Sequence, residues 1–402
     1  MNNRERALAI LNYQAYDRMP LVHFGFWRET LQKWVSEGHL TEDEIRRWGD
    51  GTPADARIAQ RLGLDCNWGQ CFAPLTGLFP PIEEKVLEQL PGGSRKFLNR
   101  DGAIVIQKDG AFGIPSEVDH LLKGRKEWDE HFQPRLAYRR ERITGGVVGI
   151  NFPFSADKTV TYPSVNTGAE MRLYGEGGLD YLREGQWTVP YGLYCGSLYG
   201  LMRDWVGLVG LSYLQVDDPG LHEEMIRTVA DLCYECVKAV LANGVRLDFA
   251  HFWEDICFRG GPLVNPRLFR SKVGVHYRRI TELLRSHGMH IISLDCDGWI
   301  DDLVPIWLEN GVNTMFPIEV GVWNGNIRPW REKYGRELRG VGGMDKKVFA
   351  HDYAAIDAEI ERLKPLVDLG GYIPCPDHRI PPDAKWENVQ YYCEKMHKAF
   401  GG

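Results

Sequence analysis

Residues 289–319 read MHIISLDCDGWIDDLVPIWLENGVNTMFPIE. Their apolar pattern predicts a strand at 290–295, a helix at 300–309 that ends before Gly311, and a second strand at 313–318. Two short apolar strands joined by a helix form the βαβ unit of a parallel sheet. This stretch therefore places the chain in the α/β class.

The same alternation continues on both sides of this unit. We expect further strands at 189–194, 246–251, 337–341 and 371–374, and helices at 197–208, 219–242, 266–287, 352–367 and 386–398. With the apolar segment 21–24 as the first strand, these units fit a closed (β/α)8 barrel of the TIM type. An open doubly wound sheet usually carries a Gly-rich phosphate loop after its first strand, and the sequence has none there.

The first third of the chain is less regular. We expect an N-terminal helical extension at 3–12 and further helices at 27–37, 41–48, 53–62 and 167–184. Short apolar runs separated by Gly-rich turns predict a small β-meander at about 83–108. We interpret the meander as an insertion packed against the barrel, so that residues 1–402 form a single domain.

Composition restricts the possible partners and the compartment. The net charge of -7 over 402 residues argues against nucleic acid or an anionic membrane as the main partner, because both favour clustered Lys and Arg. Nine cysteines without framework spacing indicate reduced thiols in a cytoplasmic enzyme. The apolar run near the N-terminus is too short for the core of a signal peptide or for a membrane span.

Ionisable side chains follow successive predicted strands. Catalytic groups of a barrel lie at the carboxyl ends of its strands, and the candidates there are Glu254 and Asp255, Asp295 and Asp297, Glu319, Asp345 and Lys346, and Cys375 and His378. An aspartate after a strand is also a common helix N-cap, and this alternative stays open for Asp295 and Asp297. Glu319 is a poor N-cap.

Three of these side chains suggest a metal site. His378 lies in a proline-rich loop where a core histidine is not expected, and Asp297 and Glu319 follow two neighbouring strands. Two oxygen ligands and one nitrogen ligand with an open position have the composition of a catalytic zinc site. Asp295 is a possible further ligand, and Cys375 is either a sulfur ligand or a buried thiol.

Several segments resemble the uroporphyrinogen decarboxylase superfamily. They are RERALAILNYQAYDRMPLVHFG at 4–25, GSLYGLMRDWVGLVGLSYLQVDDPGLHEEMI at 196–226, GGPLVNPRLFRSKVGVHYRRI at 260–280, GVGGMDKK at 340–347 and GGYIPCPDHRIPPDAKWENVQYYCEKM at 370–396. The resemblance covers most of the chain after 189 and implies a (β/α)8 barrel. The decarboxylases carry an arginine-rich RQAGR-type motif after the first strand, whereas this chain has the mostly apolar HFGFWR at 23–28.

This difference favours another branch of the superfamily, the zinc-dependent corrinoid methyltransferases. Their first zinc motif is H-x-C-G, and 295–298 of this chain, Asp-Cys-Asp-Gly, resembles it with oxygen in place of sulfur. His378 lies near the position of their late cysteine. A zinc ion held by oxygen and nitrogen is a harder Lewis acid, which suits an ether oxygen. The resemblance implies a methyltransferase that demethylates a methoxylated, aromatic compound and passes the methyl group to cobalt.

The resemblance also implies roles around the zinc ligands Asp297, Glu319 and His378. Trp27, Trp253 and Trp323 are expected to stack on the substrate ring, with Glu254, Asp255 or Lys346 orienting the substrate or moving a proton. The remaining candidates for substrate binding are His23, Tyr194, His251 and Asp345. The chain lacks a DxHxxG motif for cobalamin, so a separate corrinoid protein is expected to dock at the barrel mouth.

Two alternatives remain at this level. One is a metal-free decarboxylase or lyase of the same superfamily, with Asp or Lys as the general acid. The other is a non-catalytic barrel that binds a tetrapyrrole or a corrinoid partner.

Overall fold

A computed structural model describes residues 1–46, 48–111, 114–148, 172–185 and 187–401. Its largest sheet has seven strands in the order β17-β16-β15-β14-β11-β10-β3. From β3 onward these are β3 (Cys71–Phe72), β10 (Gly192–Tyr194), β11 (Phe249–Trp253), β14 (Ile292–Asp295), β15 (Thr314–Phe316), β16 (Arg339–Met344) and β17 (Tyr372–Pro376). All neighbours pair in parallel, and nearly all strand residues are buried, as expected for a sheet covered on both faces.

Two further strands lie next to this sheet. β1 (Val22–His23) pairs in parallel with β2 (Cys66–Asn67), which is followed closely by β3. On the other side, Ile380, just after β17, accepts a hydrogen bond from Trp27 N at 3.2 Å. Its own N–H donates to Gly25 O at 3.1 Å. The parallel α/β architecture is therefore confirmed, and the closed (β/α)8 barrel stays a prediction.

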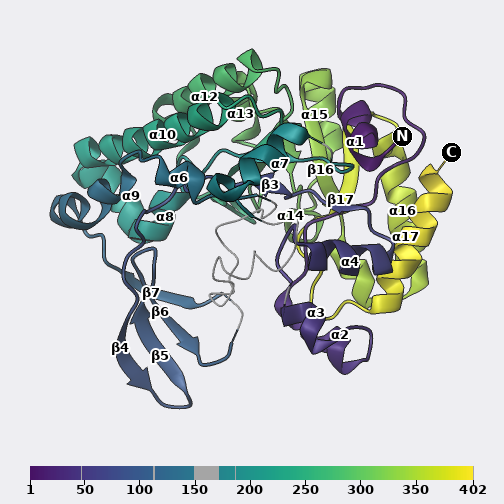
Figure 1. Cartoon of the computed structure of the whole chain (residues 1–402), viewed down its shortest axis with the longest axis horizontal. Helices are drawn as coiled ribbons and strands as arrows, with labels where there is room; N and C mark the ends of the chain where they lie inside the picture. The colour runs from purple at the N-terminus through teal and green to yellow at the C-terminus, as the bar shows by residue number, and fades with distance from the viewer. Residues whose placement is uncertain (47, 112–113, 149–171, 186, 402) are drawn as a thin grey trace.

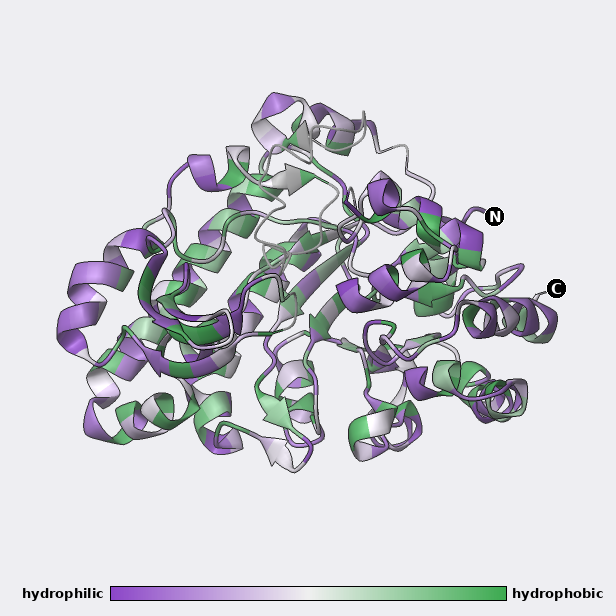
Figure 2. Cartoon of the chain, turned by 90° about the horizontal axis from the view of Figure 1, so that it is seen from below, coloured by the Kyte–Doolittle hydropathy of each residue, from purple (hydrophilic) through white to green (hydrophobic). Residues whose placement is uncertain are grey.

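Helices surround the strands (Figure 1). They are α1 (Asn3–Leu11), α2 (Arg28–Ser36), α3 (Glu42–Arg46), α4 (Pro53–Leu62), α8 (Gly200–Val206), α9 (Leu208–Asp217), α10 (Pro219–Leu241), α12 (Val275–Ser286), α13 (Val304–Glu309), α14 (Val320–Trp323), α15 (Ile327–Tyr334), α16 (Tyr353–Val367) and α17 (Trp386–Phe400). Figure 2 shows apolar and polar residues alternating along them, the pattern of helices with one face against a core. Among the described residues, no helix has both the length and the apolar character that a membrane span requires.

Shorter elements connect these helices and strands. They are α5 (Arg125–Glu127), α6 (Glu141–Thr144), α7 (Gly178–Glu184) and α11 (Pro266–Leu268), the π-helical turns Trp128–Phe132 and Phe269–Gly274, the 3-10 helices Gln133–Leu136, Tyr174–Glu176, Gly335–Glu337 and Lys346–Ala350, and the strand pairs β8 (Val147–Val148) with β9 (Arg172–Leu173) and β12 (Cys257–Phe258) with β13 (Gly261–Pro262).

Four predicted helices differ from the structure. The helix expected at 300–309 begins only at Val304. The helix expected at 266–287 is interrupted by the π-helical turn Phe269–Gly274. Phe269 and Val273 are both buried in this turn, so their apolar pattern resembles that of a continuous α-helix. The helix expected at 197–208 ends at Gly207, whose φ of 76° lies outside the helical region. Of the helix expected at 167–184, only α7 is α-helical in the described part. Residues 167–171 lie outside the described residues.

The predicted meander is present as an antiparallel sheet that projects from the main body at the lower left of Figure 1. It contains β4 (Lys85–Leu90), β5 (Ser94–Leu98), β6 (Ala103–Lys108) and a fourth strand, β7 (Ser116–His120), which the sequence analysis missed. β7 has no buried residue, so it lacks the apolar alternation that marks a strand. The sheet has a small core of its own, formed by Phe97, Ala103 and Val105.

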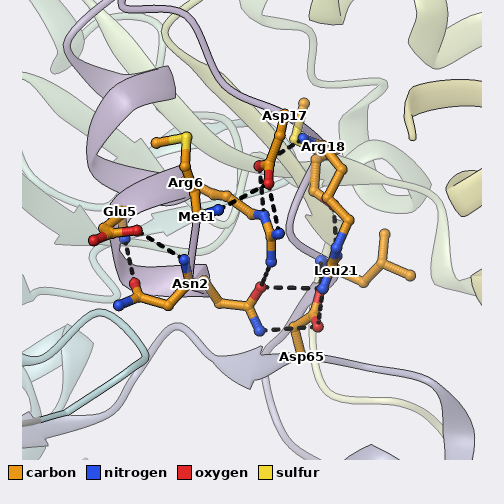
Figure 3. A network of polar contacts seen from close by, with 10 residues as sticks. Met1, Asn2, Glu5, Arg6, Asp17, Arg18, Leu21 and Asp65 are labelled. Atoms are coloured by element: carbon orange, nitrogen blue, oxygen red, sulfur yellow. Dashed lines mark hydrogen bonds and ion pairs between the residues drawn. The ribbon is translucent and has the colours of Figure 1, made fainter. Parts of the chain in front are cut away.

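A polar network attaches the N-terminal helix to the first strands (Figure 3). Asp65, just before β2, accepts hydrogen bonds from Arg18 Nη1 at 2.7 Å, from Asn3 Nδ2 at 2.9 Å and from Leu21 N at 2.8 Å. Because Leu21 directly precedes β1, this one carboxylate joins α1 to both strands. Its hydrogen bonds thus help to fix where β1 begins.

Candidate active site

The carboxyl ends of the parallel strands lie at one edge of the sheet, which brings distant parts of the sequence together. The closest contact between predicted ligands joins His378 Nε2, after β17, to Asp297 Oδ2, after β14, at 3.2 Å. Asp297 Oδ1 is buried and has no hydrogen-bond partner among the described residues. A buried carboxylate oxygen without a donor is costly, so this atom is available to a cation or to a ligand proton.

Aromatic rings hold His378 in place. The Trp27 ring stacks on the imidazole, with centroids 5.5 Å apart and an interplanar angle of 15°, and Phe24 meets it edge-on at 5.2 Å. Trp27, predicted to stack on a substrate, thus also stacks on a predicted metal ligand. This contact fixes the ring orientation of His378.

Glu319 belongs to the same cluster. Its Oε2 accepts a hydrogen bond from Gly298 N at 2.7 Å, and Gly298 has a φ of 83° with backbone atoms of Cys257 2.8 Å from where a Cβ would lie. Burial, followed by the charge of Asp297, raises the pKa of Glu319 to about 7, although the Gly298 N–H, Lys346 and His378 act in the opposite direction. The three predicted metal ligands therefore lie within electrostatic reach of one another.

Two further aspartates crowd this cluster. Burial, then the charges of Asp297 and Asp255, raises the pKa of Asp295 well above its usual value. Burial and the charge of Asp297 raise the pKa of Asp255 as well, although its ion pair with Arg203 at 3.2 Å acts to lower it. Carboxylates this close repel one another unless they share protons or a cation.

The types of side chain in this cluster fit a divalent metal ion. Asp297, Glu319 and His378 supply oxygen and nitrogen donors, and Asp297 Oδ1 is unpaired. Among the described residues, however, no three His, Cys, Asp or Glu side chains already stand in a metal-binding arrangement. Cys375 is fully buried, and burial, followed by Cys66 and Asp377, raises the pKa of its thiol well above the ordinary value, which favours the buried-thiol alternative.

Lys346 lies at the edge of the cluster, bound to Asp377, which sequence reasoning had not singled out. Lys346 Nζ is 3.1 Å from Asp377 Oδ1, and Asp377 Oδ2 accepts from Val320 N at 2.8 Å and Gly321 N at 3.0 Å. Asp377 therefore ties the ends of β15, β16 and β17 together. In the sequence, its position directly before His378 was the one signal that could have identified Asp377 as a site residue.

Glu254 lies outside the cluster, which argues against its predicted catalytic role. Both of its oxygens are occupied by donors, namely Leu198 N at 2.7 Å, Gly200 N at 2.8 Å, Tyr199 N at 2.9 Å, Ser197 Oγ at 3.1 Å and the Tyr277 hydroxyl. The carboxylate satisfies backbone N–H groups before and at the start of α8, which have no intrahelical partner. We therefore expect a structural role for this carboxylate.

Other predicted pocket residues are scattered. Asp345 caps the 3-10 helix after β16 by accepting from Lys347 N at 3.0 Å. Trp323 lies 6.1 Å from Trp330 in a separate surface pocket. Tyr194 is buried, and Trp253 is half-buried 6.0 Å from the Arg203 guanidinium.

The two histidines predicted to bind substrate, His23 and His251, are fully buried. His23 Nδ1 accepts from Gly25 N at 3.0 Å, so the proton of the neutral ring is on Nε2. His251 Nδ1 lies 3.3 Å from Ser293 Oγ. Burial lowers the pKa of His23 to about 4 and that of His251 to about 3, and in both rings Nε2 has no partner among the described residues.

These pKa shifts predict acid sensitivity. The folded pKa of His251 lies below its unfolded value, so its contribution to stability is present above about pH 6.5 and is lost as the pH falls towards 3. Between pH 7 and pH 5, this histidine alone should lower the free energy of unfolding by about 2 kcal/mol. In urea unfolding, the decrease in the free energy of unfolding from pH 7 to pH 5 should be smaller by that amount in His251→Gln than in wild type. A His290→Gln control, at an exposed site, should show the wild-type decrease. Equal drops in all three proteins would contradict the prediction.

Comparison with known proteins supports the fold. No protein-family model matches the chain, and no curated protein matches it. A methyltransferase from Methanosarcina mazei has a similar structure, with a TM-score of 0.60 over 99% of both chains at 15% identity. At this identity the match shows a shared fold over the whole chain.

Two methionine synthases are more distant. The B12-independent methionine synthase from a Shewanella species has a TM-score of 0.38 at 14% identity, over 55% of this chain and 66% of the other. The putative vitamin-B12 independent enzyme from Listeria monocytogenes has a TM-score of 0.34 at 14% identity, over 56% and 70%.

Proposed function

We propose that this chain is a zinc-dependent methyltransferase on a (β/α)8 barrel, which moves a methyl group from a methoxylated aromatic compound to the cobalt of a separate corrinoid protein. The observation that carries the proposal is the contact between Asp297 and His378, whose charges both act on the Glu319 carboxyl. The fold shared with a methyltransferase supports the transfer of a methyl group in general terms. The oxygen-rich donor set favours an ether substrate over a thiol.

The side chains of the cluster would share the tasks of binding the metal ion, orienting its ligands and supplying positive charge. Asp297, Glu319 and His378 would hold the metal ion, which supplies Lewis acidity towards the ether oxygen. Trp27 and Phe24 keep the His378 ring oriented. Lys346, fixed by Asp377, places a positive charge beside Glu319 and favours its ionised form. Glu319 must lose its proton before it can bind a metal ion, so this charge assists loading.

The corrinoid would come with a partner, since the sequence lacks a DxHxxG motif. The partner would dock at the carboxyl ends of the strands, where the cluster lies. The docking face and the substrate pocket would have to coincide there, because the corrinoid would accept the methyl group directly from the bound substrate.

A second candidate is a metal-free lyase of the same fold. The pKa of Glu319, raised to about 7, favours it, because a carboxylic acid that keeps its proton near neutral pH can act as a general acid. In that case a chelator would leave activity intact.

Metal analysis and one assay separate the two candidates. Purified protein should contain zinc, and it should transfer methyl groups from guaiacol-type ethers to reduced cobalamin. Dialysis against a chelator should abolish transfer, and added zinc should restore it. Absence of zinc together with absence of transfer from every methoxylated compound would leave the lyase as the better proposal.

A further inference from the structure

A second polar and aromatic site lies beside the acidic cluster. It is a surface pocket of about 380 Å³ whose walls include Arg259, Trp299, Asp301, Trp323, Asn324 and Trp330. These residues come from the β12–β13 hairpin, the turn after β14, and the segment α14–α15. None of the predicted metal ligands lines it. The volume is within the range of small-molecule sites.

The aromatic wall is held in place by polar contacts. Trp330 is only 4% exposed, and its Nε1 donates to Asp301 Oδ1 at 2.7 Å. Trp323 packs 6.1 Å from Trp330. Trp299 N donates to Phe258 O at 3.0 Å, which attaches the hairpin to this wall. A preformed wall of indoles lowers the entropic cost of binding a flat ring.

Exposed apolar side chains lie in, and next to, the segments that line the pocket. Trp299, which lines it, is 41% exposed, and Phe258 (64%) and Val322 (44%) directly precede the lining residues Arg259 and Trp323. Large apolar side chains gathered at a pocket rim mark binding sites more often than they occur by chance on a surface. The backbone N–H of Trp299 donates a hydrogen bond to Phe258 O, so the segment that carries the exposed ring is held in place.

Two donors of the pocket lack acceptors. Trp323 Nε1 is buried and has no hydrogen-bond partner among the described residues. Arg259 forms no hydrogen bond or ion pair with any residue that the structure describes. A free guanidinium beside a wall of indoles matches a ligand with a carboxylate on a flat ring.

We infer that this pocket binds an aromatic carboxylic acid, with the ring against the tryptophans and the carboxylate on Arg259. The site is independent of the proposed methyl transfer. It adjoins the cluster along the chain, because Trp299 is two residues beyond Asp297 and Trp323 is four residues beyond Glu319.

The test measures binding of benzoate by calorimetry, without any turnover. Trp299→Ala and Arg259→Gln should each weaken binding about tenfold, and Arg267→Gln, at another exposed arginine nearby, should leave it unchanged. Benzamide, which has the ring without the charge, should bind equally to wild type and Arg259→Gln. Cyclohexanecarboxylate, which has the charge without the π face, should bind more weakly than benzoate.

Three results would overturn the inference. They are no heat of binding with benzoate at millimolar concentration, equal binding of cyclohexanecarboxylate and benzoate, and loss of benzoate binding in Asp297→Asn with none in Trp299→Ala. The last result would place the ligand in the acidic cluster instead. Because none of these readouts requires methyl transfer, failure of the proposed function would leave the inference standing.

Discussion

Replacing Glu254 by alanine should lower the free energy of unfolding by about 3–5 kcal/mol. The substitution removes the acceptor for three backbone N–H groups, those of Leu198, Tyr199 and Gly200, at a site that is fully buried. It also leaves the hydroxyls of Ser197 and Tyr277 without their acceptor. Water cannot replace these hydrogen bonds in a closed interior, so the full desolvation cost remains. Urea unfolding followed by circular dichroism measures the change.

The matched control is Glu282→Ala on α12, the helix that carries Tyr277, because Glu282 is exposed. Its effect should stay within about 0.5 kcal/mol. Tyr277→Phe removes a single donor and should cost less than Glu254→Ala. A Glu254→Ala protein as stable as wild type but devoid of activity would instead establish a catalytic role for this carboxylate.

Replacing Asp297 by alanine should reduce methyl transfer by about 10³-fold and should also release the bound zinc. Asp297 contacts His378, raises the pKa of Glu319, Asp255 and Asp295, and holds the unpaired Oδ1. No other side chain has this central position among the described residues of the cluster. Zinc content and single-turnover transfer to reduced cobalamin, measured on the same preparation, are the two readouts.

The control for this variant is Asp302→Asn, an exposed aspartate that follows the same turn. It should retain zinc and activity. The free energy of unfolding should not fall in Asp297→Ala, because removing one of several repelling carboxylates relieves charge in the metal-free protein. Retention of both zinc and activity within threefold would refute the proposed metal site.

Local patterns predicted most of the strands and long helices of the second half of the chain, although α9 and α15 were not predicted. α10 was expected at 219–242 and runs from Pro219 to Leu241, because Asp218 accepts from Leu221 N at 2.9 Å and Pro219 suits the first turn. Such caps act within one turn of helix, so they are visible in the sequence. The strand β7 and the π-helical turn before α12 were missed because neither has a local apolar signature of its own.

The candidate site was predictable only in part. The sequence by itself determined that ionisable residues follow successive strands, and parallel pairing then brings Asp297, Glu319 and His378 to one edge. Only the tertiary structure decided between Glu254 and Asp255, adjacent carboxylates of the same segment. One is buried among five donors, and the other lies in the cluster beside Asp297. The reason is physical: a carboxylate's role depends on which donors and charges surround it, and those come from segments far away along the chain.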